Sequence, residues 1–301
     1  MSTLFAQTII IGLISGCVYS LLAMGMVLVY RTTGVLNIAH GGVGILAGFV
    51  AWDLITYRHF PYLAGVLAGV AFAVLMALAF ERYVARKLPS AGAVTVATLG
   101  LLLITQGIVF VVPWWSNNSA QVFASPLVGK SVDIPGADFA LSYDRVVLVI
   151  TVAAFFLGCR FLLRRTRLGL AMRAVSDDPA ASRLMGVHEQ LVSPVVWALA
   201  FGIAAVSTVL LSHTSEVLGN TGIVALTLKA LVVTFVGGLV SLPLTVVGAI
   251  ALGIMEEYSK IYLFDIAGLS DAVPFILMVA VLLIRLARPT KALGEEALAT
   301  A

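Results

Sequence analysis

Charged residues are scarce in this sequence. Asp, Glu, Lys and Arg make up 11% of its 301 residues, whereas 61% are hydrophobic. Soluble domains are about 25% charged, because their surfaces face water. The low charge excludes a water-soluble globular protein, and we interpret the chain as an integral membrane protein with most of its mass in lipid. We therefore expect the lipid bilayer, and no nucleic acid, among its partners.

Cysteine and the common catalytic motifs are also missing. Cys17 and Cys159 lie far apart in apolar segments, which excludes a disulfide framework and a metal-ligand spacing. There is no serine elbow, HExxH, CxxC or plausible carboxylate pair. The segment ASPLVGKS, residues 124–131, has Ala124 where a phosphate-binding loop has its first glycine. We predict no enzyme activity, no metal site and no bound cofactor, so that any ATP used is bound by a partner subunit.

The long apolar runs predict an all-α polytopic membrane protein with eight to nine transmembrane helices in one domain, residues 1–301. The first run, residues 5–30, has no Lys or Arg before Arg31 and is too long for a signal peptide, so we expect a permanent helix. The full set of predicted spans is 5–30, 34–52, 61–84, 92–113, 143–163, 190–212, 221–238, 242–261 and 272–288. The spans 34–52 and 221–238 are short and glycine-rich, which is typical of discontinuous segments.

Basic residues predict the orientation, because cytoplasmic loops collect Lys and Arg. Alternating the spans places four basic clusters on one side, with the N-terminus outside and the C-terminus in the cytoplasm. The clusters are Arg31; Arg82, Arg86 and Lys87; Arg160, Arg164, Arg165, Arg167, Arg173 and Arg183; and Arg285, Arg288 and Lys291. Loops 53–60, 114–142, 213–220 and 262–271 are then outside.

Small residues recur every three or four positions in several spans, which allows helix backbones to approach closely in lipid. Three such series are predicted as packing seams: Gly12, Gly16, Ser20 and Ala23; Gly41, Gly44 and Gly48; and Gly65, Gly69 and Ala73.

Two segments with polar residues interrupt the apolar sequence, and we call them polar passages. GVLNIAHGGVG, residues 34–44, places Asn37 on one helical stripe with Gly41, with His40 beside it. Such groups should face protein or a water-filled path. For Asn37 an interhelical hydrogen bond is the favoured interpretation. For His40 that role and a position beside a translocation route are equally open.

The second passage, KALVVTFVGGLVSLPLTVVG, spans residues 229–248 and contains Gly237, Gly238 and Pro243. Lys229 has no obvious acidic neighbour in sequence. It is either a functional intramembrane lysine or one that snorkels to the interface. The two passages occupy corresponding places in the two halves of the chain, which indicates an internal repeat around a central path.

The predicted cytoplasmic loop, residues 164–189, should contain a short capped helix. Asp178 is a good N-cap before Pro179, and Gly186 suits the C-terminal cap. Leu184 and Met185 give this helix an apolar side. It is expected to fit a groove of a partner protein, the alternative being a helix lying on lipid headgroups.

Three ordered blocks resemble the permeases of branched-chain amino-acid ABC importers. They are residues 19–42, with Leu36, Asn37, Ala39, His40 and Gly41; residues 165–188, with Gly169, Arg173, Ala174, Ala181, Leu184 and Gly186; and residues 228–257, with Lys229, Gly237, Gly238, Ser241, Pro243, Gly248 and Gly253. Ile38 departs from the usual Phe, Gly42 stands where the family often has Glu, and Val240 and Leu244 replace small glycines. The family also includes permeases for urea, amides and other small organic solutes, which leaves the cargo open.

The resemblance implies a permease subunit in a bacterial inner membrane. Its implied partners are two ATPase subunits, a second permease chain that is identical or homologous, and an extracytoplasmic substrate-binding protein. The predicted substrate path comprises Asn37, His40, Gly41, Gly42, Lys229, Gly237 and Gly238. The predicted ATPase coupling surface comprises Arg173, Asp177, Asp178, Ala181, Leu184 and Gly186.

Two other function classes compete with this interpretation. An ion-coupled secondary transporter working alone would more often carry intramembrane Asp or Glu, whereas the acids here lie mostly near predicted loops or span ends. A non-transporting membrane scaffold would have little use for Lys229 and His40.

Overall fold

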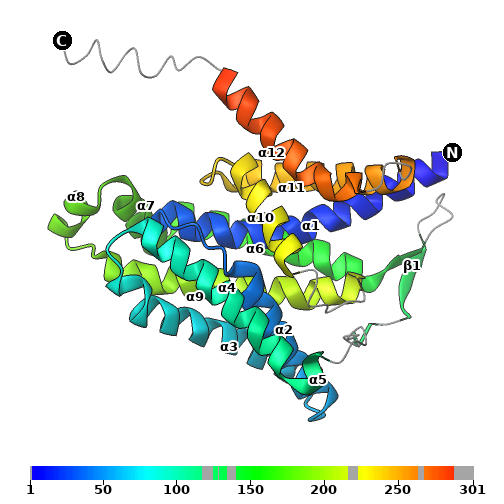
Figure 1. Cartoon of the computed structure of the whole chain (residues 1–301), viewed down its shortest axis with the longest axis horizontal. Helices are drawn as coiled ribbons and strands as arrows, with labels where there is room; N and C mark the ends of the chain where they lie inside the picture. The colour runs from blue at the N-terminus through cyan, green and yellow to red at the C-terminus, as the bar shows by residue number, and fades with distance from the viewer. Residues whose placement is uncertain are drawn as a thin grey trace.

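A computed structural model describes residues 2–116, 125–127, 129–133, 140–215, 223–263 and 268–287. These residues form a helical bundle (Figure 1). Its elements are α1 (Ser2–Thr33), α2 (His40–Thr56), α3 (Tyr62–Tyr83), η1 (Ala85–Lys87), α4 (Ala91–Val111), α5 (Pro113–Ser116), β1 (Ser131–Asp133), β2 (Ala140–Ser142), α6 (Tyr143–Arg165), α7 (Arg167–Asp177), α8 (Pro179–Leu184), α9 (Glu189–Ser215), α10 (Ile223–Val236), α11 (Leu242–Tyr262) and α12 (Leu269–Ala287).

The predicted all-α membrane fold is confirmed, and each of the nine predicted spans contains a helix. Within the described residues, six helices are long and apolar enough to cross a membrane, while α2, α10 and α12 provide shorter apolar stretches. The predicted second span was wrong at its start, because α2 begins at His40 and not at residue 34. The predicted helix stripe of Asn37 therefore does not exist. The only strands among the described residues are β1 and β2, which pair antiparallel with Val132 opposite Leu141.

Helix α1 forms the centre of the bundle, and its residues from Tyr19 to Val29 are almost all buried. It contacts α11 most extensively and also packs against α9, α10 and α6. A Cβ atom built on Gly12 or Gly16 would lie 2.6 Å from the Cα of Ile254 or Ile250, respectively. The predicted seam along α1 is confirmed, since only glycine permits so close an approach to the α11 backbone.

The bundle has two distinct ends (Figure 1). Helices α7 and α8 lie at one end, which we call the α8 end, and β1 and the N-terminus lie at the opposite end. The loop 164–189 and the N-terminus thus lie at opposite ends of the bundle, and their placement on the two sides of a membrane stays a prediction. Parts of the predicted outer loops 114–142, 213–220 and 262–271, residues 221–222, and the basic residues Arg288 and Lys291 lie outside the described residues.

Candidate functional site

The polar passage around Asn37 begins where α1 ends and the chain turns back into the bundle. Gly34 has a φ of +68°, a conformation that glycine adopts without strain. The amides of Leu36 and Ile38 donate hydrogen bonds of 3.1 Å each to the hydroxyls of Thr95 and Thr98 on α4. Because α4 satisfies these backbone groups, the passage runs without helical structure inside the bundle.

Helix α2 starts deep inside the bundle for this reason. The ring of His40, its first residue, packs against Gly25 of α1 and lies 6.3 Å, centroid to centroid, from Phe201 in the middle of α9. Its N-cap, Ala39, supplies no side-chain acceptor. The first N–H groups of a helix have no partner within it and form the positive end of the helix dipole. The α2 N-terminus is thus an uncapped, buried donor site.

Asn37 and His40 are completely buried, with 0% of each residue exposed. The amide of Asn37 has no hydrogen-bond partner among the described residues, and the ring nitrogens of His40, which lies near the backbone of Leu22, make no contact there with hydrogen-bond geometry. The interhelical hydrogen bond that was predicted for Asn37 is therefore absent. A buried polar group without a partner costs about 1–3 kcal/mol, so two adjacent ones call for a functional explanation.

Gly41 and Gly42 act as close-packing positions next to these polar groups. A Cβ atom on Gly41 would collide with the Thr227 side chain of α10, and one on Gly42 would lie 2.7 Å from Leu102 Cδ1 of α4. The pair therefore lets α10 and α4 close around the start of α2. The structure places these glycines beside Asn37 and His40, as the sequence predicted.

A cavity of about 610 Å³ opens toward this region from the α8 end. Val35, Val94 and Trp197 are among its lining residues. Thr98 and Phe201, which flank the polar passage, lie one helical turn beyond Val94 and Trp197. The cavity stops short of Asn37 and His40, which do not line it.

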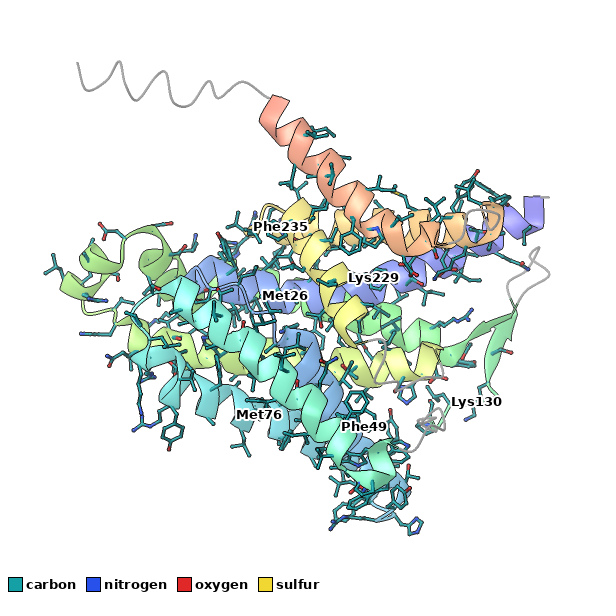
Figure 2. The ribbon with its side chains drawn as sticks, viewed as in Figure 1. Met26, Phe49, Met76, Lys130, Lys229 and Phe235 are labelled. Carbon is teal, nitrogen blue, oxygen red and sulfur yellow. The ribbon has the colours of Figure 1, made fainter. Side chains whose placement is uncertain are left out.

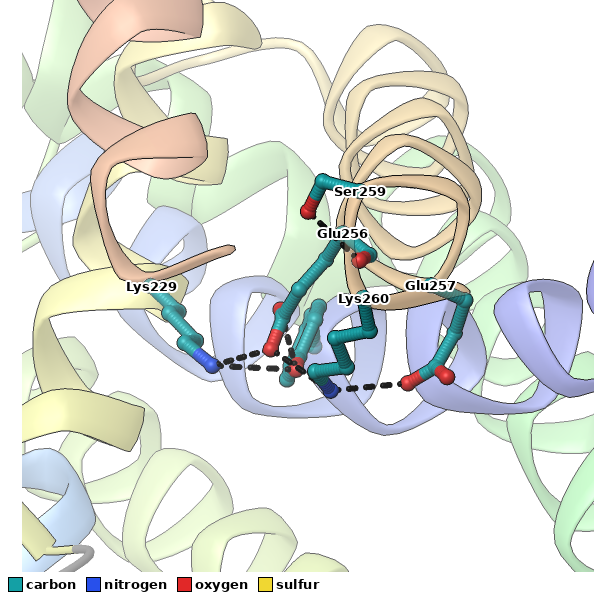
Figure 3. Close-up of polar contacts among 6 residues, drawn as sticks. Lys229, Glu256, Glu257, Ser259 and Lys260 are labelled. Carbon is teal, nitrogen blue, oxygen red and sulfur yellow. Dashed lines mark hydrogen bonds and ion pairs between the residues drawn. The ribbon is translucent and has the colours of Figure 1, made fainter. Parts of the chain in front are cut away.

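Lys229 lies elsewhere, on the face of α10 that packs toward α1 and α11 (Figures 2 and 3). Its Nζ is 2.6 Å from Oε1 of Glu256 on α11, and the hydroxyl of Tyr19 on α1 donates a 2.8 Å hydrogen bond to Oε2 of Glu256. Only 18% of the Lys229 side chain and 2% of the Glu256 side chain are exposed. Lys229 is therefore paired inside the bundle and does not snorkel to its surface.

The carboxylate of Glu256 also has a second cation. Nζ of Lys260 lies 3.1 Å from the same Oε1 atom and 2.9 Å from Oε1 of Glu257 (Figure 3). We call Tyr19, Lys229, Glu256, Glu257 and Lys260 the ion-pair cluster. Sequence reasoning missed Glu256, although its spacing of four residues from Lys260 is a recognisable helix-face pair.

Gly237 and Gly238 form the turn between α10 and α11, where Val240 lines a cavity of about 350 Å³ together with Gly34 at the start of the polar passage; Asn37 and His40 do not line that cavity. Gly238 and Leu239 both have positive φ, 68° and 66°, and a Cβ on Gly237 would lie 3.0 Å from the amide nitrogen of Thr245. The seven predicted path residues thus occupy three places: the start of α2, the ion-pair cluster and this turn.

The predicted short helix at the α8 end is confirmed within one residue. The Asp178 carboxylate accepts hydrogen bonds of 2.8 and 3.0 Å from the amides of Ala180 and Ala181, and Gly186 has a φ of +81°. Leu184 is 91% exposed. Its neighbour Met185 is 85% exposed, so the two side chains form an apolar patch of the kind that contacts a partner protein or a membrane.

The predicted coupling residues divide between two surfaces. Asp178, Ala181, Leu184 and Gly186 belong to α8 and its flanks, whereas Arg173 and Asp177 lie on α7 and line a groove shared with α6. The sequence did not reveal that α7 is a separate helix.

Comparison with known proteins supplies the family. The sequence profile of the family described as "Branched-chain amino acid transport system / permease component" matches residues 8–282. The chain belongs to this family. It is a multi-pass membrane protein and the permease subunit of an ATP-binding-cassette importer, as the sequence resemblance implied.

Individual relatives agree with this membership. The high-affinity branched-chain amino acid transport system permease protein BraD of Pseudomonas aeruginosa is 28% identical, covering 97% of this chain and 96% of its own. LivH of Escherichia coli, a permease protein of the same description, is also 28% identical over the same shares. The ribose import permease protein RbsC of Escherichia coli is 24% identical over 80% of this chain and 74% of its own. Among solved structures, PsaBC from Streptococcus pneumoniae in complex with Fab has a TM-score of 0.47 and 14% identity, covering 95% of this chain and 92% of that one.

Proposed function

We propose that this permease carries branched-chain amino acids or a related small polar solute, and that the solute passes the Asn37–His40 passage. The observation that supports this is the pair of completely buried, unpartnered polar side chains at the uncapped N-terminus of α2. The uncapped N–H groups and the positive end of the helix dipole suit the carboxylate of an amino acid. Asn37 and His40 offer further donors and acceptors for the same polar group.

The cavity at the α8 end suits a release route to the cytoplasm. Its deepest lining residues approach to within one helical turn of the residues around His40. The packed glycines Gly41 and Gly42 close the start of α2 against α10 and α4. We propose that a relative shift of these helices opens the passage, since no Cβ atoms intervene at either contact.

The partners follow from the importer class. One of two ATPase subunits would dock at α8, where Leu184 offers an exposed apolar anchor, and the other would dock on the second permease chain; closure of the ATPases on ATP would move α7 and α8 against the bundle. A second permease chain and an extracytoplasmic binding protein would complete the complex. This chain itself would bind no ATP and catalyse no reaction. We place it in a bacterial inner membrane, with the α8 end and the C-terminus in the cytoplasm.

Uptake into proteoliposomes tests the proposal. The complete complex, with its ATPases and binding protein, should accumulate radiolabelled leucine or another branched-chain amino acid when ATP is present inside the proteoliposomes. His40→Ala should abolish accumulation while leaving complex assembly intact, and Gly100→Ala, at an unobstructed helix surface, should leave it unchanged. Uptake by the permease alone under a sodium or proton gradient would refute the importer mechanism. If urea, amides or small organic acids are accumulated and leucine is not, the transported solute belongs to that alternative class.

A further inference from the structure

A strongly basic groove lies at the α8 end, apart from the Asn37 passage and the tip of α8. It has a volume of about 890 Å³ and is bounded by α1, α6, α7 and the turn before α11. Five arginines and one acid are among its lining residues: Arg31, Arg160, Arg164, Arg165, Arg173 and Asp177.

The residues that the structure describes do not balance the charges in this groove. None of the five arginines forms an ion pair with a described residue, and Asp177 is the only acid lining the groove. Nε of Arg173 donates a 3.4 Å hydrogen bond to the carbonyl oxygen of Gly169, one helical turn earlier in the same helix. Crowded guanidinium groups repel one another, and their planar forks bind phosphate oxygens in pairs. The groove therefore suits an anion with several oxygens.

The position of the groove indicates where such an anion comes from. Arg160, Arg164 and Arg165 end α6, an apolar helix that is long enough to span a membrane. Phe161, between them, is 63% exposed, and Leu157 one turn earlier is 61% exposed. Arginines directly after an outward-facing apolar surface lie at the depth of the phospholipid headgroups.

We propose that this groove binds the phosphate headgroup of an anionic phospholipid, with the acyl chains lying along the exposed apolar face of α6. The bound headgroup bridges α1, α6, α7 and the α10–α11 turn, and neutralises arginines that have no ion pair with the described residues. Arg173 and Asp177 then face lipid, and the ATPase contact is confined to α8. The inference needs only the membrane placement of the chain, whatever solute it carries.

Native mass spectrometry of the full chain in detergent tests this proposal. Dioleoyl phosphatidylglycerol is titrated against dioleoyl phosphatidylcholine, with sodium phosphate as a separate arm. Wild type should retain phosphatidylglycerol and not phosphatidylcholine, and phosphate should bind far more weakly because it lacks acyl chains. The groove variant Arg160→Gln/Arg164→Gln should weaken phosphatidylglycerol binding by about twenty-five-fold, from roughly a fivefold contribution of each arginine.

A matched control removes the same charge elsewhere at the same end. Arg82→Gln/Arg167→Gln changes two exposed arginines that do not line the groove, and it should keep wild-type affinity. If the groove double variant does not fold, the single variant Arg164→Gln should show a loss of about fivefold.

Three results would overturn the proposal. The first is equal retention of phosphatidylcholine and phosphatidylglycerol, and the second is unchanged phosphatidylglycerol binding in the folded groove variant. The third is a groove variant that loses the ATPase subunits from the assembled complex while its affinity for phosphatidylglycerol is unchanged. That result would make the groove a protein-docking surface.

Discussion

Two polar clusters lie inside this bundle, one around the buried carboxylate of Glu256 and one around the buried Asn37 and His40, and they differ in whether the described residues complete them. In the ion-pair cluster, the carboxylate of Glu256 has Lys229, Lys260 and the Tyr19 hydroxyl as partners, all within 3.1 Å. In the Asn37 passage, neither Asn37 nor His40 has a partner among the described residues. A cluster whose polar groups are all paired fixes the positions of the helices in an apolar interior. A cluster with unpaired groups can form hydrogen bonds with a transported solute.

The largest loss of stability is expected when Glu256 is replaced, because it is the central partner of the ion-pair cluster. Glu256→Met leaves Lys229 buried without a carboxylate and should lower the free energy of unfolding by about 3–5 kcal/mol. Lys229→Met should cost less, because Lys260 still neutralises Glu256 at 3.1 Å. Thermal unfolding in detergent measures both. The double variant Lys229→Met/Glu256→Met should recover much of the loss, and a double variant worse than Glu256→Met would show that the pair is not the source of the effect.

Packing next to the Asn37 passage gives the next largest effect. Gly41→Ala drives a methyl group into the Thr227 side chain of α10 and should lower the free energy of unfolding by about 1–3 kcal/mol. Gly100→Ala is the control, because nothing lies within 4 Å of its Cβ position and alanine favours a helix. Parallel melting curves compare the two variants. Equal stability would mean that the start of α2 is loosely packed.

The Asn37 passage itself should respond with the opposite sign. Asn37→Leu removes a buried amide that has no hydrogen-bond partner among the described residues. It should raise the free energy of unfolding by about 1 kcal/mol, because the desolvation cost of that amide is no longer present. ATP-driven uptake by the complete complex should fall at least about tenfold, the change expected for one lost hydrogen bond to a charged group. Destabilisation with normal uptake would assign Asn37 to the same structural class as Glu256.

The smallest change in stability is expected at the tip of α8. Leu184→Asp alters a side chain that is 91% exposed, so the free energy of unfolding should stay within about 0.5 kcal/mol of wild type. ATPase subunits should nevertheless be lost on purification of the complex, whereas Leu184→Met should retain them. Retention of the subunits and of uptake by the Asp variant would exclude α8 as the coupling surface.

The local features of the fold were predictable. Each span follows from an apolar run long enough to cross lipid, and the α8 cap follows from Asp178 and Pro179 within one turn. The start of α2 was not predictable, because its position depends on Thr95 and Thr98, about 60 residues away on α4. The partner of Lys229 was missed for the same reason, since Glu256 belongs to another helix.

The sequence by itself determined that this chain is a membrane protein, which segments form its helices and where its arginines cluster along the chain, because these features depend on composition and short-range periodicity. Only the tertiary structure decided which polar groups are paired. Glu256 pairs with two lysines, Asn37 and His40 have no hydrogen-bond partner in the described part of the chain, and five arginines converge on one groove. Hydrogen bonds and ion pairs act over a few ångströms, so their partners depend on how distant helices pack and not on their spacing along the chain.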